Sequence, residues 1–317
     1  MRIFATIAIA CLPLLAQAQA WPSKPIRMIV PFPAGGGTDF IGRLAAKQLS
    51  ERLGQPVFVD NRGGANGSIG VQAMMQSAPD GYTLGAISDG PTVINPVLYE
   101  KNPYHPLRDF LPVAQMIKFP SMLVAHPSVP AKNVAELIAL AKAKPGALNY
   151  SSGGIGNFSH LGPELLAYQA GIKLVHVPYR GVGPATQAIL AGEVQLMYNN
   201  VATALEHVKA GKLTALAVGE PKRLPALPDI PAIAETVPGF EFAAWVGIFA
   251  PLKTPPEIVA RVSRETAAFL KDPEVLKIFG EQQIVASYRD SDDFAKYIRS
   301  ELDKWGPIIK TLGIKPE

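Results

Sequence analysis

IRMIVPFPAGGGTDFIGRLA, residues 26–45, combines a β-branched apolar run, a Pro-Phe-Pro stop, three glycines and the start of a helical pattern. The apolar run Ile26–Val30 predicts a strand. Apolar residues then recur with a period near 3.6 up to Leu53, and Gly54 follows as a helix-ending residue. This stretch predicts a strand, a glycine-rich loop and a helix in direct succession, which is how an α/β unit begins.

The same succession continues along the chain. A helix is predicted at Ile69–Gln76, between strands at Val57–Val59 and Tyr82–Ile87. A second unit starts with a strand at Ala147–Tyr150 and the glycine loop SSGGIGN at 151–157. Later strands are predicted at Leu174–Val177, Val194–Tyr198 and Leu213–Val218. The βαβαβ order favours two α/β units, each a mostly parallel sheet with helices on both faces.

The end of the chain predicts one long amphipathic helix. Phe294, Tyr297, Ile298, Leu302 and Trp305 fall on one helical face. We expect Ser291 or Asp292 to cap its start. A helix of this length after the second unit is expected to pack back across the first, which would make the first domain discontinuous in sequence.

Composition excludes several classes of protein. The chain has 317 residues, enough for two compact domains, and a formal net charge of +4. Its basic residues are scattered and form no cluster of the kind that follows phosphates, so no nucleic-acid partner is expected. We expect a monomer.

Residues 1–20 have the pattern of a signal peptide. One Arg precedes an apolar stretch that ends in Ala18-Gln19-Ala20, which predicts cleavage after Ala20 and a periplasmic mature protein. The alternative, a membrane anchor, is disfavoured because residues 3–16 are too few to span a bilayer. The single cysteine, Cys11, lies in this segment, so thiol chemistry is not expected of the mature chain.

Neither glycine loop fits a nucleotide-binding motif. No Lys follows Gly37 as a Walker loop requires, and Phe40 and Ser159 occupy the sixth position of G-x-G-x-x-G in the two loops. The glycines could serve only tight turns. They could also let an anion reach the unpaired amides of a helix N-terminus, which suits a carboxylate. A further glycine loop, RGGANGSIG at 62–70, also precedes a predicted helix, and three such loops in one chain make the second interpretation stronger.

Catalytic motifs are weak. The five histidines have no metal-binding spacing, and no cofactor or metal is expected. Ser68 lacks a G-x-S-x-G frame. His160 follows Ser151 and Ser152 closely, so an exported hydrolase of small esters or amides stays as an alternative.

Several side chains have both a structural and a ligand-binding interpretation. Asp39 is expected to cap its helix, although it could also contact a ligand. Trp245 could belong to the core or form a wall of a cleft. Asn199, with Asn200, ends an apolar strand where ligands of α/β sheets bind. Arg180 could clamp a carboxylate but is better explained as a surface residue.

The segment WPSKPIRMIVPFPAGGGTDFIGRLAAKQL resembles the start of the Bug family, the solute receptors of tripartite tricarboxylate transporters. The resemblance continues through VDNRGGANGSIG, APDGYTLG, INPVLY, LNYSSGGIGNFSHL, VPYRGVGPAT and FAAWVGIFAPLKTP. These motifs occur in order over nearly the whole mature chain.

This resemblance implies a periplasmic binding protein with two lobes, type II-like, that closes like a Venus flytrap. It implies that backbone amides and bridging waters hold a small mono- or dicarboxylate, which is delivered to membrane transporter subunits or sensed. We expect residues 21–121 and 245–317 in the first lobe and 122–244 in the second, with hinges near Phe119–Met122 and Phe242–Trp245.

Together, the residues and the resemblance give one expected set of ligand-binding positions. The set comprises Phe32, Ala34, Gly35, Gly36, Gly37, Thr38, Asp39, Ser88, Ser151, Ser152, Gly153, Gly154, Gly156, Asn157, His160, Tyr179, Gly181, Asn199 and Trp245. Family members often have Asp where this chain has Asn199. The missing charge would disfavour an ammonium group in the cleft, so amino acids are expected to be poorer ligands.

Overall fold

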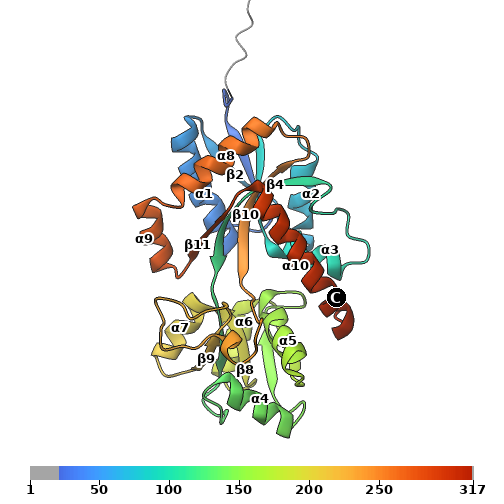
Figure 1. Ribbon diagram of the computed structural model, residues 1–317, viewed down its shortest axis with the longest axis vertical. Helices are drawn as coiled ribbons and strands as arrows, with labels where there is room; N and C mark the ends of the chain where they lie inside the picture. The colour runs from blue at the N-terminus through green and yellow to red at the C-terminus, as the bar shows by residue number, and fades with distance from the viewer. Residues whose placement is uncertain (1–20, 316–317) are drawn as a thin grey trace, which may run out of the picture.

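The computed structural model describes residues 21–315, which form two lobes joined by long strands (Figure 1). The expected signal peptide lies outside the described residues. Each lobe is built on one sheet. The first has the order β11-β4-β10-β3-β1-β2 and the second the order β7-β6-β8-β5-β9.

The first sheet combines early and late parts of the chain. Its strands are β1 (Ile26–Val30), β2 (Val57–Asn61), β3 (Thr83–Ser88), β4 (Phe110–Phe119), β10 (Ala244–Pro251) and β11 (Val285–Arg289). The second sheet uses only the middle of the chain. Its strands are β5 (Ser121–Ala125), β6 (Asn149–Ser152), β7 (Val175–Pro178), β8 (Leu196–Asn200) and β9 (Thr214–Val218).

Both sheets are mixed, so the expectation of mostly parallel sheets was wrong. In the first sheet β1 pairs in parallel with β2 and β3, whereas β10 runs antiparallel to β3 and β4, and β11 antiparallel to β4. In the second, β6 is parallel to β7 and β8, but β5 is antiparallel to β8 and β9. The chain leaves the first lobe along β4 and returns along β10. Two such neighbouring strands must run in opposite directions.

Helices cover both faces of each sheet, as expected. In the first lobe they are α1 (Gly37–Leu53), α2 (Ser68–Met75), α3 (Asn95–Leu98), α8 (Pro256–Phe269), α9 (Pro273–Glu281) and α10 (Ser291–Leu312). In the second they are α4 (Val134–Ala143), α5 (Phe158–Ala170), α6 (Val182–Leu190) and α7 (Val201–Lys209). Short helical turns are η1 (Ala65–Gly67), η2 (Gly90–Ile94) and η3 (Ile233–Glu235).

Successive residues of a strand point to opposite faces of the sheet, so the apolar core is divided between these two faces. On β1, Met28 and Val30 pack with α1 and α8, whereas Ile29 belongs to the opposite cluster, which includes α2 and α10. The cluster that contains Ile29 extends from the first lobe into the second, since it also contains buried residues of α4 and α5.

The final helix α10 packs on the first lobe and runs toward the second (Figure 1). Its buried face includes Phe294, Ile298 and Trp305. Asp290 is its N-cap, with a side chain that accepts a hydrogen bond from the Asp293 amide, so the expected caps Ser291 and Asp292 were wrong. The true cap lies one residue earlier because Asp290 has the extended backbone that a capping residue needs.

Candidate functional site

A cavity of about 440 Å³ lies between the two lobes. It is lined from the first lobe by Phe32, Pro33, Ala34, Gly36, Gly37, Thr38, Asn66, Ser88, Asp89, Gly90, Phe119, Ala244 and Trp245. From the second lobe it is lined by Gly156, Asn157, Phe158, Leu161 and Asn200. The carboxyl ends of β1 and β3 and the start of α1 therefore border the cavity. Open α/β sheets bind ligands at this edge.

The first glycine loop presents a helix N-terminus to this cavity. Gly36 is the N-cap of α1 and no side chain caps the helix there. In the described structure the amides of Gly37 and Thr38 donate to no protein group, whereas the Phe40 amide bonds to the Gly36 carbonyl. Unpaired amides at a helix start carry partial positive charge, so the loop offers a binding site for an anion.

Asp39 acts from behind this loop. Its carboxylate is buried, accepts hydrogen bonds from the Gly35 amide at 2.9 Å and from Asn61 at 2.8 Å, and pairs with Arg43 at 2.9 Å. Burial acts to raise the pKa of Asp39, but these bonds outweigh it and lower the pKa. Asp39 does not line the cavity. The expectation that Asp39 caps its helix was wrong, because Gly36 is the N-cap and no side-chain bond caps α1 in the described residues. Asp39 lies in the first turn of α1 and holds the loop in shape through the Gly35 amide.

The second glycine loop is arranged differently. Gly153 donates to Ser159 Oγ at 2.9 Å and Gly154 to Ser152 Oγ at 3.1 Å. The Gly156 amide donates to His160 Nδ1 at 3.1 Å, and Asn157 Oδ1 accepts from the Ser159 amide at 3.0 Å. Most amides of this loop are therefore already bonded within the protein.

The same loop touches the first lobe. A Cβ added to Gly156 would lie 2.8 Å from Leu98 of α3, and the backbone there has φ of +76°. Only glycine combines this conformation with so close an approach. Gly156 and Asn157 thus line the cavity as part of the contact between lobes.

Eight expected positions of the second lobe do not line this cavity. They are Ser151, Ser152, Gly153, Gly154, His160, Tyr179, Gly181 and Asn199. Asn199 is 2% exposed and its amide faces Thr186 of α6. Its neighbour Asn200 lines the cavity instead, since successive strand residues point to opposite faces. Gly35 also lies outside this cavity, although it borders a smaller hollow beside the loop.

Two histidines stack behind the second loop. The rings of His160 and His176 are 3.9 Å apart, and Tyr150 stacks on His176 at 5.0 Å. Burial lowers the pKa of His160 to about 3, and His176 acts in the same direction. Burial lowers the pKa of His176 to about 4. Both imidazoles are therefore neutral near pH 7.

A serine–histidine contact exists, but not the expected one. Ser152 Oγ lies 2.5 Å from His176 Nε2, whereas His160 is bonded to the Gly156 amide. Ser152 is fully buried and outside the cavity. A nucleophile needs access to its substrate, so the geometry of Ser152 supports a structural role.

Several residues line the cavity without having been expected from the sequence. Asp89 and Gly90 follow β3 directly, so their position after a strand could have signalled them. Asn66 lies in the glycine loop before α2, and its amide donates to Asn95 Oδ1 at 2.7 Å. Phe119, Phe158 and Leu161 carry no such signal because apolar side chains in strands and helices usually belong to the core.

Trp245 belongs to the core and also forms a wall of the cavity, which are the two positions that its sequence context allowed. It is fully buried and packs against Phe294 at 5.1 Å and Tyr297 at 6.1 Å. It also lines the cavity, and its indole Nε1 has no hydrogen-bond partner among the described residues.

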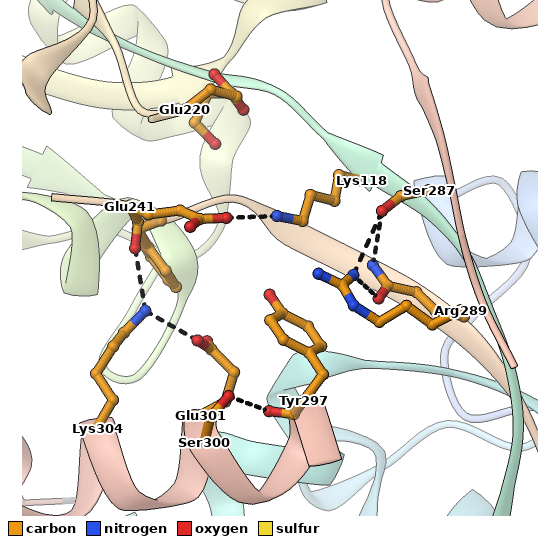
Figure 2. A network of polar contacts seen from close by, with 12 residues as sticks. Lys118, Glu220, Glu241, Ser287, Arg289, Tyr297, Ser300, Glu301 and Lys304 are labelled. Atoms are coloured by element: carbon orange, nitrogen blue, oxygen red, sulfur yellow. Dashed lines mark hydrogen bonds and ion pairs between the residues drawn. The ribbon is translucent and has the colours of Figure 1, made fainter. Parts of the chain in front are cut away.

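Charged side chains gather beside the two crossings between lobes (Figure 2). Lys118, at the end of β4, pairs with Glu241, just before β10, at 2.5 Å. Lys304 of α10 donates to the Glu241 carbonyl and to Glu301, both at 3.0 Å. These contacts tie both crossings to the final helix.

A buried acid lies beside this network (Figure 2). Glu220 follows β9, and its Oε1 accepts from the Ser121 amide at 3.3 Å while Oε2 has no partner in the described part of the chain. Burial raises the pKa of Glu220 to about 7. On the side of Lys118 away from Glu220, the guanidinium carbon of Arg289 lies 4.0 Å from the centre of the Tyr297 ring (Figure 2).

The fold and the cavity between its lobes define a two-lobed α/β solute-binding protein of the periplasmic type. The family described as tripartite tricarboxylate transporter family receptor, TctC, matches residues 41–314. The chain belongs to this family, which confirms the resemblance to Bug receptors.

Individual relatives agree over almost their whole length. Protein BugT of Bordetella pertussis is 35% identical, with 98% of this chain and 95% of that protein covered. A solved R. palustris protein, Rpa4515 with adipate, has a TM-score of 0.80 and 34% identity, with 94% and 100% covered. MatC from Rhodopseudomonas palustris, with bound malate, has a TM-score of 0.76 and 30% identity, with 91% and 100% covered.

Two features are absent from the described residues. No helix in residues 21–315 has the length and apolar character to cross a membrane. Within the same residues, no three His, Cys, Asp or Glu side chains are grouped so that they could hold a metal ion.

Proposed function

We propose that the protein is a periplasmic receptor that captures a small carboxylate in the cavity between its lobes. The observation that carries this proposal is the start of α1, where the amides of Gly37 and Thr38 border the cavity and have no acceptor within residues 21–315. Support comes from two relatives whose structures hold adipate and malate, both carboxylates.

The first loop would provide the main anchor through its backbone. Its side chains are small and Arg180 is exposed outside the cavity, so no arginine is needed as a clamp. Backbone capture with bridging waters leaves the other walls free to set selectivity. Binding would draw the lobes together by bending at the crossings near Phe119 and Ala244. A membrane transporter subunit would then recognise the closed shape.

Gly36→Val tests this anchor. Gly36 has φ of −85°, and an added Cβ would come no closer than 4.0 Å to the Pro33 carbonyl, so valine fits the backbone. Its methyl groups would keep a ligand from the amides. We expect at least about 100-fold weaker binding of whichever carboxylate binds the wild type, with adipate and malate tested first by calorimetry.

Gly280→Val is the matched control, because Gly280 lies in α9 with open space around it. This variant should bind as the wild type does. Unchanged binding by Gly36→Val would show that the anchor lies elsewhere. Binding of no carboxylate by the wild type would refute the proposed function.

A hydrolase is the competing function. It predicts turnover of small esters or amides by the purified protein, lost in His160→Ala. We propose instead that the cavity binds its ligand without changing it, because Ser152 and both stacked histidines lie outside it. Turnover that depends on His160 would overturn this proposal.

A further inference from the structure

Asp89 brings an acidic group to the cavity, whereas the first glycine loop offers the partial positive charge of its amides. It lies between the end of β3 and the start of η2 and lines the same cavity as Gly36, Gly37 and Thr38. Burial raises the pKa of its carboxyl group, and the nearby backbone amides of Asp89 itself, Trp245 and Gly90 act in the opposite direction.

No cationic side chain of the described residues pairs with Asp89. None of the ion pairs formed within residues 21–315 includes it. The titratable groups that act on it from α10 are Glu301, an acid, and Tyr297. The nearby Lys304 pairs with Glu301, and Lys118 with Glu241. Burial without a partner favours the neutral form of such a carboxyl group, and a cationic group of a ligand would offset that cost and restore the charge.

The other walls suit the same kind of group. Aromatic side chains line the cavity at Phe32, Phe119, Phe158 and Trp245. Aromatic faces attract cationic nitrogen. Asn200, on the second lobe, has a buried Oδ1 without a partner among the described residues, which is a second free acceptor for an N–H donor.

We propose that Asp89 determines specificity by binding a cationic nitrogen of the ligand, whose carboxylate is held at the first glycine loop. This inference rests on the proposed function and narrows its ligand class to small amino carboxylates. It replaces the expectation that amino acids are poor ligands. That expectation depended on Asn199, whose side chain lies outside the cavity.

Pairs of ligands of equal length test the inference directly. 6-Aminohexanoate and adipate differ in one end group, ammonium against carboxylate, and 4-aminobutyrate and succinate form a shorter pair. Calorimetry should show tighter binding of the amino member of at least one pair to the wild type. Asp89→Asn has nearly the same shape and should weaken that ligand by about 30-fold or more, while binding of the dicarboxylates stays equal or improves.

The pH dependence gives an independent readout. Burial raises the pKa of Asp89 to about 7, so its negative charge is partial near neutrality. The ligand ammonium stays protonated up to roughly pH 9. Affinity of the wild type for the amino carboxylate should therefore rise from pH 6 to pH 8, and Asp89→Asn should abolish that rise.

Each outcome has one meaning. The inference fails, and the proposed function stands, if dicarboxylates bind and amino carboxylates do not. In that case dicarboxylate binding would depend on Gly36, and Asp89→Asn would leave it unchanged or weaken it. If no carboxylate of either kind binds, both fail. Asp89→Ser, checked for folding by circular dichroism, repeats the test should Asp89→Asn be unstable.

Discussion

The two glycine loops have similar sequences but different structures. In the first, 34–39, the amides of Gly37 and Thr38 border the cavity and donate to no group in the described part of the chain. In the second, 151–157, the amides of Gly153, Gly154 and Gly156 bond to serine and histidine side chains. A glycine loop before a helix is thus not by itself an anion site. The deciding feature is whether nearby side chains have already taken its donors.

This difference predicts opposite effects of mutation. Changes in the first loop should impair binding with little loss of stability, as for Gly36→Val. Changes in the second should reduce stability with less effect on binding.

Ser159→Ala should have the largest effect on stability among the second-loop changes. Ser159 is fully buried, and its Oγ accepts from the Gly153 amide at 2.9 Å and donates to Asn157 Oδ1 at 2.8 Å. Alanine leaves the Gly153 amide without its acceptor and removes one of the two donors to Asn157 Oδ1, which still accepts from the backbone amide at position 159. We expect a loss of about 2 kcal/mol of unfolding free energy. Urea unfolding measures this loss.

Ser300→Ala is the control, since Ser300 is exposed and bonds only to the Tyr297 carbonyl in its own helix. It should change stability by less than about 0.5 kcal/mol. If Ser159→Ala kept full stability but lost ligand binding, the second loop would contact the ligand directly.

The stacked histidines should make the protein less stable in acid. The folded-state pKa values of His160 and His176, about 3 and about 4, are below the ordinary value of 6.5. The unfolded chain therefore takes up protons first as pH falls below 6.5, and their contribution to stability declines from there toward the folded pKa. The expected slope is about 1 kcal/mol per pH unit for each histidine.

His160→Asn isolates this effect, because asparagine can still accept from the Gly156 amide but does not titrate. The free energy of unfolding of the variant, measured between pH 6.5 and pH 5, should fall less steeply than that of the wild type. Burial raises the pKa of Glu220 to about 7, so this acid opposes the histidines in the same window. The comparison with the variant separates the two. Equal slopes would mean that His160 is protonated in the folded protein.

Arg180→Ala should have the smallest effect. Arg180 is exposed next to the start of α6 and does not line the cavity. Affinity should stay within about twofold and stability within about 0.5 kcal/mol of the wild type. A complete loss of carboxylate binding would identify Arg180 as the clamp and contradict backbone capture.

Local sequence patterns predicted the elements well. The β-branched run at Ile26–Val30, the glycines and the periodic residues up to Leu53 correspond to β1, the first loop and α1. The final helix also follows its pattern, with an error of one residue at the cap. Such features depend on residues close in sequence, so the sequence contains nearly all of the information.

Side-chain direction at the ends of strands was less predictable. Asn199 and Asn200 are adjacent and chemically identical, yet one faces α6 and the other the cavity. A shift of one residue reverses the face of every strand residue. Asp89 was overlooked because its importance depends on which cationic groups lie nearby in space.

The sequence by itself determined the elements, the two glycine loops and the family of the protein, since those are written in residue order. Only the tertiary structure decided that the sheets are mixed and that the amides of the second loop are bonded to side chains. It also decided that, among the described residues, the first loop's amides have no acceptor and Asp89 in the cavity has no counter-charge. These properties arise from groups far apart in the chain, such as β3 and β10 or Gly156 and Leu98, and contacts of that kind exist only once the chain has folded.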